Sequence, residues 1–289
     1  MFKNIIKTFR IKQWLKNGFL FAAIIFDGQL FNIDAFSHTF AGFLVFCLLS
    51  SSVYTLNDVF DKEADKQHPI KSSRPIASGK IPLHTAVFIA LLMSSTALIA
   101  AYFLSPSFLV LCGVYLFMNI LYSKWLKHIP ILDVMIIAAG FVIRVAAGVS
   151  LIKVDRFSPW LYVVTTLLSL FIGFGKRRAE LVLLSKDANQ HRVVFEGYSI
   201  PFLDQLITIV SSTTVVSYSL YTFSAPNLPE NHSMMLTIPF VLYGIFRYLY
   251  LIQIEQSGGA PEELVLKDNP LKLSVLFYGI SVLIIFYFL

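Results

Sequence analysis

The sequence predicts an all-α integral membrane protein, a bundle of nine transmembrane helices with its polar loops gathered on one side. Three observations predict this fold class: the composition, the recurrence of long apolar segments and the one-sided placement of charge. Of the 289 residues, 56% are hydrophobic and only 14% are charged. A soluble protein carries roughly 25% charged residues, so this chain has too little charge to cover a soluble surface. The composition also argues against a disordered chain, a disulfide scaffold and a nucleic-acid-binding domain.

Apolar segments recur along the whole chain, and a helix needs about 20 mainly apolar residues to cross a bilayer. The first segment is the weakest, because Asp27 and Gln29 interrupt it. The third and fourth come from one stretch that is too long for a single helix and that Ser105-Pro106-Ser107 breaks. The nine predicted spans are residues 17–33, 37–56, 83–104, 107–122, 131–152, 159–175, 201–223, 233–254 and 271–289.

Nine spans place alternate loops on opposite sides of the membrane, and the basic residues gather on one side. Nineteen of the 23 lysines and arginines lie on the side of the N-terminus, against Lys153 and Arg156 on the other side. Because cytoplasmic loops hold the excess of Lys and Arg, we expect a multi-pass protein of the plasma (inner) membrane with its N-terminus in the cytoplasm and its C-terminus outside. We also expect a single transmembrane domain over residues 1–289.

Carboxylates gather on the same predicted side, directly after the second span. If that helix continues through residues 57–65, Asn57, Asp61 and Asp65 share one stripe of its surface, with Asp58 beside it. Neighbouring carboxylates repel one another, and a hard divalent cation removes the repulsion. Magnesium favours a few carboxylates together with phosphate oxygens and water. The pattern therefore indicates a magnesium site formed by these four residues; the alternative is a solvated charged loop.

Two basic segments on this side are suited to phosphate groups. Lys71 and Arg74 lie in a loop that two prolines and two serines keep out of regular helix. Lys176, Arg177 and Glu180 close the sixth span. One interpretation is that they form a second anion-binding group that faces the acidic stripe. The other is that the cations only mark the cytoplasmic end of the span and pair with the neighbouring acid along the helix.

Further candidates are single polar residues at or inside the spans. Tyr122 and Lys127 crowd the short loop before the fifth span, and Lys16 belongs to an amphipathic segment before the first. Arg144 and Arg247 fall inside spans, where a charge is costly and indicates a partner or a polar cavity. Arg247 lies about two turns from the cytoplasmic end of its helix and could reach a site there. Arg144 lies deeper in its span, and the alternative to a role in the site is that it forms a structural pair there.

The segment Asn57-Asp58-x-x-Asp61-x-x-x-Asp65, followed by Arg74-Pro75 and Gly79, resembles the aspartate-rich motif of the UbiA superfamily of intramembrane prenyltransferases. The resemblance covers essentially the whole chain, since the nine-helix bundle of that family matches the number of predicted spans. Its members hold a magnesium-bound diphosphate over a lateral cavity that opens to lipid. The resemblance therefore implies Mg²⁺ as the cofactor, with the three aspartates as catalytic residues.

One departure from the family pattern separates its subgroups. Aromatic prenyltransferases of the superfamily carry a second aspartate-rich motif after the sixth helix, where this chain has Gly175-Lys176-Arg177-Arg178-Ala179-Glu180-Leu181. This basic segment is similar to that of the polyprenyl-phosphate (decaprenyl-phosphate) phosphoribosyltransferases. The similarity implies transfer of 5-phosphoribose from 5-phosphoribosyl 1-diphosphate to a polyprenyl phosphate, with release of diphosphate. The substrate-binding residues that it implies are Lys16, Asn57, Lys71, Arg74, Tyr122, Lys127, Arg144, Lys176, Arg177, Glu180, Tyr198 and Arg247.

Two other functions stay open at this point. The first is a UbiA-type aromatic prenyltransferase, such as a 4-hydroxybenzoate polyprenyltransferase, that uses a prenyl diphosphate and has a degenerate second motif. The second is a transporter or a membrane scaffold. A transporter usually shows broken or polar helices near the midplane, whereas here the charge lies at one interface. The expected partners are the two substrates and the bilayer, with no nucleic acid, and the sequence leaves open whether the chain forms a homo-oligomer.

Overall fold

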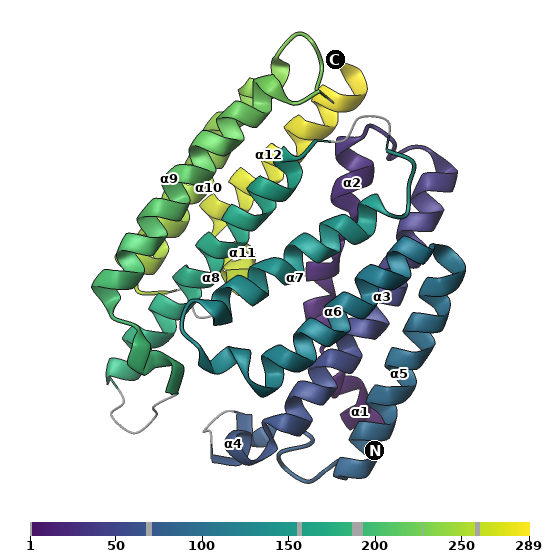
Figure 1. Cartoon of the computed structure of the whole chain (residues 1–289). Coiled ribbons are helices and arrows are strands. Elements are labelled where there is room, and N and C mark those ends of the chain that lie inside the picture. Colours follow the sequence, from purple (N-terminus) through teal and green to yellow (C-terminus); the bar gives the residue numbers. More distant parts are fainter. Residues whose placement is uncertain (1, 68–70, 155–157, 187–192, 227, 258–260) are drawn as a thin grey trace. The chain divides into compact units, whose positions relative to one another are not determined.

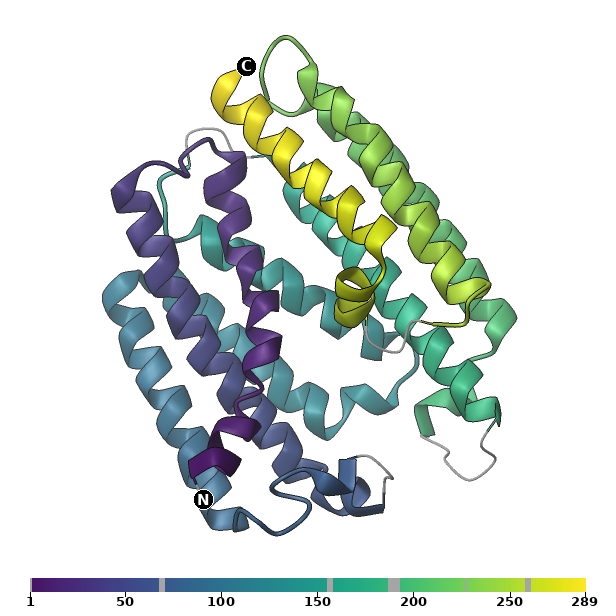
Figure 2. The same ribbon diagram turned by 180° about the vertical axis from the view of Figure 1, so that it is seen from behind.

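The chain is folded into helices and short turns, with no strand among the residues that the structure describes (Figures 1 and 2). The structure, a computed structural model, describes residues 2–67, 71–154, 158–186, 193–226, 228–257 and 261–289. The predicted all-helical class is confirmed. The chain divides into two compact units, which are described one at a time. Unit 1 comprises Met1–Ile25, Gln29–Lys127 and Ile143–Val154, and unit 2 comprises Phe26–Gly28, His128–Val142 and Asp155–Leu289.

Unit 1 is organised around one long helix. The side chain of Asn32 caps this helix by accepting from the backbone N–H groups of Asp34 and Ala35. Phe46 on this helix packs in a buried core with Leu20, Phe108 and neighbouring apolar residues. In chain order the helices of unit 1 are α1 (Phe2–Thr8), the 3₁₀ helix η1 (Ile11–Leu20), α2 (Phe21–Phe26), α3 (Ile33–Phe60), α4 (Lys62–Gln67), the 3₁₀ helix η2 (Lys71–Ser73), α5 (Leu83–Leu104), α6 (Pro106–Lys124), the 3₁₀ helix η3 (Leu126–His128) and the end of α7 (Leu132–Val149).

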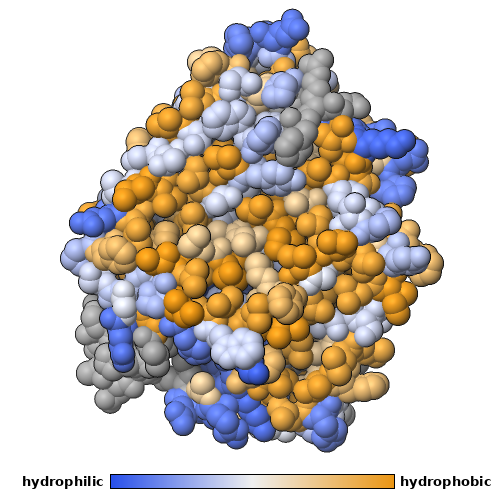
Figure 3. Space-filling view, in the orientation of Figure 1, coloured by the Kyte–Doolittle hydropathy of each residue, from blue (hydrophilic) through white to orange (hydrophobic). Residues whose placement is uncertain are grey.

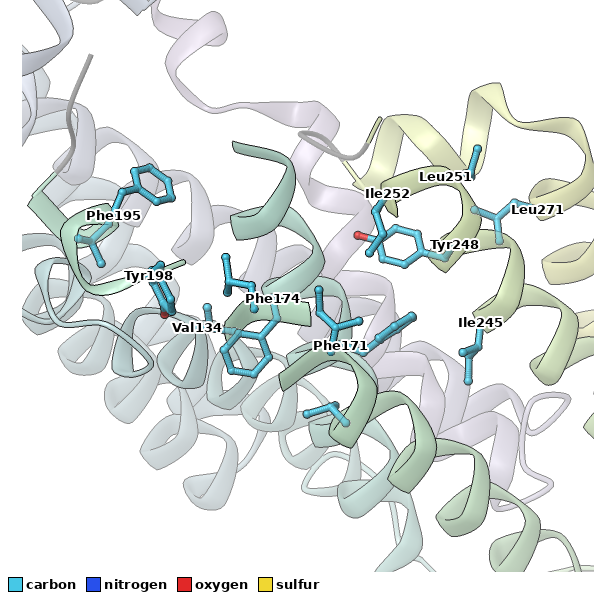
Figure 4. Packing of buried hydrophobic residues seen from close by; sticks show 14 residues of the cluster. Val134, Phe171, Phe174, Phe195, Tyr198, Ile245, Tyr248, Leu251, Ile252 and Leu271 are labelled. Carbon is cyan, nitrogen blue, oxygen red and sulfur yellow. The ribbon is translucent and has the colours of Figure 1, made fainter. Parts of the chain in front are cut away.

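Unit 2 is held by a second apolar core, whose aromatic rings lie between its helices (Figure 4). The rings of Phe171 and Tyr248 lie 5.2 Å apart in an edge-to-face arrangement. A Cβ atom at Gly175 would lie 2.9 Å from Tyr248, so glycine is needed for the close approach of the two helices. Besides the start of α7, the helices of unit 2 are α8 (Trp160–Lys186), the 3₁₀ helix η4 (Val193–Gly197), α9 (Ile200–Ser224), the 3₁₀ helix η5 (Ser233–Thr237), α10 (Ile238–Gln253), α11 (Pro261–Lys267) and α12 (Asn269–Phe288).

Seven of the described helices are long and apolar enough to cross a membrane: α3, α5, α6, α7, α9, α10 together with η5, and α12. The predicted count of nine is not confirmed. The predicted break between the third and fourth spans is confirmed, since α5 ends at Leu104 and α6 begins at Pro106. Residues 159–175 were predicted as a span and lie almost wholly in α8, but α8 continues to Lys186 through three adjacent cations that lower its mean hydropathy.

The first predicted span, residues 17–33, differs most from the structure. It contains the end of the 3₁₀ helix η1, then the six-residue α2, then a turn. Gly28 adopts a positive φ of 71° in that turn, which ends the helix before α3 begins at Ile33. Asp27 and Gln29 therefore lie in the connection between α2 and α3, and they do not merely interrupt one continuous helix.

The outer surfaces of the spanning helices are apolar. Figure 3 shows apolar residues, in orange, over much of one face. On α5, Phe88, Leu91, Ile99 and Phe103 are all more than half exposed. Helices that are apolar on their outer as well as their inner sides are suited to lipid and not to water.

Candidate functional site

The polar centre of unit 1 lies where α3 ends and α4 begins. We call Asp58, Asp61 and Asp65 the acidic cluster. The backbone N–H of Asp61 donates to the carbonyl of Asn57 at 2.9 Å, and that of Asp65 donates to the carbonyl of Asp61 at 2.7 Å. Because helical hydrogen bonds continue through the junction, the predicted spacing of three, four and seven residues does bring these side chains to one region.

Two of the three carboxylates converge on one arginine. Nη1 of Arg74 lies 3.1 Å from Oδ1 of Asp58 and 2.6 Å from Oδ2 of Asp65. Both aspartates are buried, at 3% and 4% exposure. Arg10 also donates to Oδ1 of Asp58. The repulsion between the two buried carboxylates is therefore offset by guanidinium groups in this structure.

The third carboxylate has a different set of partners. Lys127 donates to Oδ1 of Asp61, and the amide of Asn57 donates to Oδ2 of the same residue at 3.0 Å. Asp61 is partly exposed, at 26% of its side chain. Of the predicted site residues, the structure thus brings together Asn57, Asp58, Asp61, Asp65, Arg74 and Lys127.

Arg74 is held in place by a compact turn after η2. Its backbone N–H donates to the carbonyl of Lys71 at 2.9 Å, and its own carbonyl accepts from Ser78 at 2.9 Å. Gly79 closes the turn at a φ of 74°, which favours glycine. Ile76 and Ile81 are buried beneath it. Lys71, another predicted phosphate ligand, is partly buried in the same turn, whereas residues 68–70 lie outside the described part of the chain.

Sequence reasoning did not assign Arg10 to the site. Arg10 adopts the left-handed conformation, with a φ of 49°, between α1 and η1, and its guanidinium lies 5.3 Å from the centre of the Tyr54 ring. Together with its contact to Asp58, this makes Arg10 part of the acidic region. Its only signal in the sequence was a place in the basic amphipathic segment before the first span.

The oxygen atoms of the acidic cluster are of the kind that Mg²⁺ binds. Within the described residues, no three His, Cys, Asp or Glu side chains lie together as ligands of one ion. Asp58 and Asp65 nevertheless share a single cationic nitrogen, so their carboxylates already converge on one position. Magnesium commonly uses one or two carboxylates and completes its octahedron with water and phosphate oxygens. These residues therefore fit a magnesium-diphosphate.

Unit 2 contains a second buried ionic centre. Nε of Arg177 lies 2.6 Å from Oδ2 of Asp133, and Arg177 also donates to Glu180 one helical turn further on. Tyr198 donates its O–H to Oδ1 of Asp133 at 2.6 Å and accepts from the backbone N–H of Ile131 at 2.6 Å. Asp133 is fully buried. Burial and the neighbouring Asp133 carboxylate both raise the pKa of Tyr198, so Tyr198 stays a neutral donor.

This arrangement brings together three of the predicted residues, Arg177, Glu180 and Tyr198, around a residue that was not predicted. Asp133 carries a weak signal in the sequence: it is an acid in the first turn of a helix whose one other charged residue is Arg144. The neighbouring Arg178 links three helices. It donates to Asp204 at 2.6 Å and to the carbonyl of Ile252 at 2.8 Å, and so joins α8 to α9 and α10.

The two arginines predicted inside spans have partners other than the residues of these two centres. In unit 2, Arg247 makes two hydrogen bonds to Asp268, at 3.1 and 2.7 Å. The Arg247 hydrogen bond and the backbone N–H of Leu271 lower the pKa of Asp268, against the opposing effect of burial. In unit 1, Arg144 is buried and donates to Asn17 and Tyr115. The remaining candidates, Lys16 on η1, Tyr122 on α6 and Lys176 on α8, are partly buried.

Comparison with known proteins identifies relatives over nearly the whole chain. Residues 18–264 match the UbiA prenyltransferase family. The decaprenyl-phosphate phosphoribosyltransferase of Mycolicibacterium smegmatis is 32% identical over 281 residues, covering 93% of this chain and 88% of that protein. The protein of the same name from Mycobacterium tuberculosis is 32% identical over 278 residues, covering 94% of this chain and 91% of that protein.

A solved structure shows the same fold. A UbiA homolog from Archaeoglobus fulgidus, bound to GPP and Mg²⁺, superposes with a TM-score of 0.74 and covers 97% of this chain and 99% of that chain. The sequence identity of that pair is 19%, so the likeness concerns the fold.

Proposed function

This chain belongs to the UbiA prenyltransferase family, and on that premise we propose that it is a polyprenyl-phosphate phosphoribosyltransferase. The proposal is carried by the similarity to decaprenyl-phosphate phosphoribosyltransferases over nearly the full length of both chains. The basic end of α8 supports it, since no second aspartate-rich motif stands there. The chain is an integral membrane protein with multiple apolar helices.

The acidic cluster is the part of unit 1 that we assign to magnesium and the diphosphate of 5-phosphoribosyl 1-diphosphate. Asp58 and Asp65 would hold Mg²⁺, with Asn57 and Asp61 beside them. A bound Mg²⁺ would neutralise charge on the diphosphate and so make it a better leaving group. Arg10, Arg74 and Lys127 already contact these carboxylates and are therefore placed to donate to phosphate oxygens. Lys16 and Lys71 are the further cations of unit 1 that we assign to substrate phosphates.

The reaction that we propose is a displacement at the anomeric carbon of the ribose. The bond from C1 to the diphosphate oxygen breaks, and its electron pair leaves with the diphosphate. An oxygen of the lipid phosphate donates an electron pair to C1 and forms the new C1–O bond. Because the lipid phosphate is already anionic, no strong general base is required. The protein contributes mainly by positioning the two substrates and stabilising the leaving group.

In unit 2 the cation that we assign to an anionic substrate group is Lys176. Its two neighbours already hold carboxylates: Arg177 binds Asp133 and Glu180, and Arg178 binds Asp204. We therefore propose that Arg177, Glu180 and Tyr198 fix the end of α8. We assign Lys176 to a phosphate group of a substrate because its charge lies at this basic end of the helix.

A direct assay tests the proposed function. Membranes that contain the protein are given labelled 5-phosphoribosyl 1-diphosphate, a polyprenyl phosphate and Mg²⁺, and the lipid fraction is examined for label. We expect phosphoribosylated lipid, its formation dependent on both the lipid phosphate and Mg²⁺. A parallel reaction with 4-hydroxybenzoate and a prenyl diphosphate should give no product. Prenylation of the aromatic acid without any phosphoribosyl transfer would assign the chain to the aromatic prenyltransferases instead.

The orientation in the membrane is part of the same proposal. We propose that the N-terminus and both ionic centres face the cytoplasm, where a soluble phosphorylated sugar is available, and that the C-terminus is outside. The excess of lysine and arginine in the loops on that side supports this orientation.

A further inference from the structure

Arg144 carries a buried charge far from the acidic cluster, and its surroundings belong to unit 1. Its side chain projects from the end of α7 and is 4% exposed. Nε donates to Oδ1 of Asn17 at 2.9 Å, and Nη2 donates to the hydroxyl of Tyr115 at 2.8 Å. The guanidinium also lies 4.9 Å from the centre of the Tyr115 ring and 5.7 Å from that of Phe46. Aromatic faces and neutral acceptors therefore stabilise this charge within the apolar core.

Asn17 connects Arg144 to η1, a segment whose own backbone hydrogen bonds stabilise it poorly. It lies in η1, a 3₁₀ helix of ten residues. Runs of 3₁₀ helix longer than three or four residues are uncommon, because their hydrogen bonds are poorly aligned. Asn17 is fully buried, and its amide donates to Oγ of Ser50 at 3.0 Å and to Sγ of Cys47 at 3.3 Å. One amide group thus joins η1 to α3 by its nitrogen and to α7 by its oxygen.

A second contact fixes η1 against α7. A Cβ atom at Gly148 would lie 2.0 Å from the carbonyl oxygen of Leu20, the last residue of η1. The helix and the backbone of η1 therefore meet so closely that only glycine fits. Gly148 lies one turn after Arg144, so α7 holds the C-terminal half of η1 at two successive turns.

Two cations that the proposed reaction uses lie on η1 or directly before it. Arg10 directly precedes η1 and binds Asp58, and Lys16 directly precedes Asn17. At about 2 Å of rise per residue, the seven residues from Asn17 to Arg10 span about 14 Å. Arg144 is thus remote along η1 from the carboxylates, yet η1 links the two.

From this geometry we infer that Arg144 is a positioning residue: acting through Asn17, it fixes η1 and thereby the placement of Arg10 at the acidic cluster and the position of Lys16 on η1. This replaces the sequence-based expectation that Arg144 binds substrate, and it rests on the proposed function. Arg144→Met, Asn17→Ala and Gly148→Ala should then have one shared effect, since each loosens the same segment. Gly113→Ala on α6 is the matched control, because a Cβ there meets no atom within 4 Å.

The first measurement is independent of activity. Hydrogen exchange of purified protein should become at least about tenfold faster over residues 11–20 in Arg144→Met and Gly148→Ala, and stay unchanged in Gly113→Ala. Unchanged exchange in Arg144→Met would overturn the inference. If that variant does not accumulate, Asn17→Ala decides, because it removes the link from Arg144 to η1 while Arg144 stays in place, and unchanged exchange over residues 11–20 in Asn17→Ala would then overturn the inference.

The second measurement uses the phosphoribosyl transfer assay. Arg144→Met and Asn17→Ala should each raise KM for 5-phosphoribosyl 1-diphosphate about tenfold with little change in kcat, and the double variant should be no worse than either alone. If Arg144→Met lowers activity by the same further factor in the Asn17→Ala background, Arg144 acts on substrate directly and the inference fails. Failure of the wild-type protein to transfer phosphoribose would instead reject the proposed function, while the exchange result would still stand.

Discussion

Asp61 and Glu63 are two acids separated by one residue, and they differ in what surrounds them. Asp61 lies in the acidic cluster with Lys127 and Asn57, while the side chain of Glu63 is 75% exposed and pairs with Lys66, which is 45% exposed. Helical spacing already separates the two acids, since it places Asp61 on the stripe with Asn57 and Asp65 and leaves Glu63 off it. In the structure the first lies in the acidic cluster and the second on the solvated surface.

The first prediction compares Asp61→Ala with Glu63→Ala. Asp61→Ala should lower phosphoribosyl transfer by at least about 100-fold, because it removes a carboxylate next to the proposed magnesium-diphosphate. Glu63→Ala should keep nearly full activity. Both variants should accumulate in the membrane at wild-type levels, since neither carboxylate is buried. Full turnover by Asp61→Ala in the transfer assay would remove this residue from the proposed site.

A buried ion pair in unit 2 allows a second comparison between single residues. Asp133 is fully buried with Arg177, whereas Asp204, the partner of Arg178, has a side chain that is 35% exposed. Removing one partner of a buried pair costs about 3–5 kcal/mol, against about 1 kcal/mol or less for an exposed pair. Thermal unfolding in detergent should therefore show a much larger loss for Asp133→Asn than for Asp204→Asn. Equal losses would mean that the Asp133–Arg177 pair is solvated in the protein.

These residues also show how far a sequence can define a site. The acidic cluster could be predicted because its members are close in sequence, and helical spacing then determines which side chains are neighbours. Arg10 and Asp58 are 48 residues apart, and Asp133 and Arg177 are 44 residues apart. No local periodicity connects positions at such separations, so Arg10 and Asp133 could be recognised only once the packing of the helices was known.

At the scale of elements, predictions based on hydropathy were accurate wherever apolar helices are simply long. Residues 83–104 coincide with α5, and the break before Pro106 follows from proline chemistry. The span predicted over residues 17–33 is not confirmed: hydropathy does not distinguish a 3₁₀ segment from an α-helix, and this segment contains both. The conformation of η1 depends on contacts such as those of Asn17 with α3 and α7, which lie far away in sequence.

The start of α12 provides a prediction about pH. Asp268 caps this helix by accepting from the N–H of Leu271 at 2.8 Å, and it also binds Arg247. Because its folded-state pKa is lowered, its contribution to stability is fully present above the unfolded-state pKa of about 3.9 and is lost as pH falls through the folded-state value. Asp268→Ala, which removes the cap, should cost about 1 kcal/mol at pH 7.

Asp268→Asn separates charge from capping, since asparagine also caps helices. Its melting temperature should be below that of the wild type at pH 7, and the difference should shrink as pH falls below about 4. Asn32→Ala, which removes the uncharged cap of α3, is the control and should show a difference that does not depend on pH. A constant difference for Asp268→Asn across this range would mean that Arg247 does not act through the charge of Asp268.

At the scale of the whole molecule, the number of membrane crossings is the property that hydropathy leaves least defined. Nine spans were predicted, and seven described helices satisfy length and apolar composition. The difference lies in the first segment and in α8, whose 27 residues are long enough to cross a bilayer but end in Lys176, Arg177 and Arg178. Cations at a helix end are compatible with a crossing, since they can mark its cytoplasmic exit.

Labelling of single introduced cysteines can decide whether α8 crosses. The two natural cysteines, Cys47 and Cys112, are buried, so a new surface cysteine is the group that reacts. Asp34 and Lys80 are exposed positions in unit 1, and Glu230 is an exposed position in unit 2.

If α8 crosses the membrane together with α3, α5, α6, α7 and α9, an even number of crossings separates Asp34 from Glu230. Cysteines at both positions should then react with a membrane-impermeant maleimide in intact cells, and a cysteine at Lys80 should react only after permeabilisation. Labelling of Asp34→Cys without Glu230→Cys would show that α8 does not cross, and labelling of Lys80→Cys alone would reverse the proposed orientation.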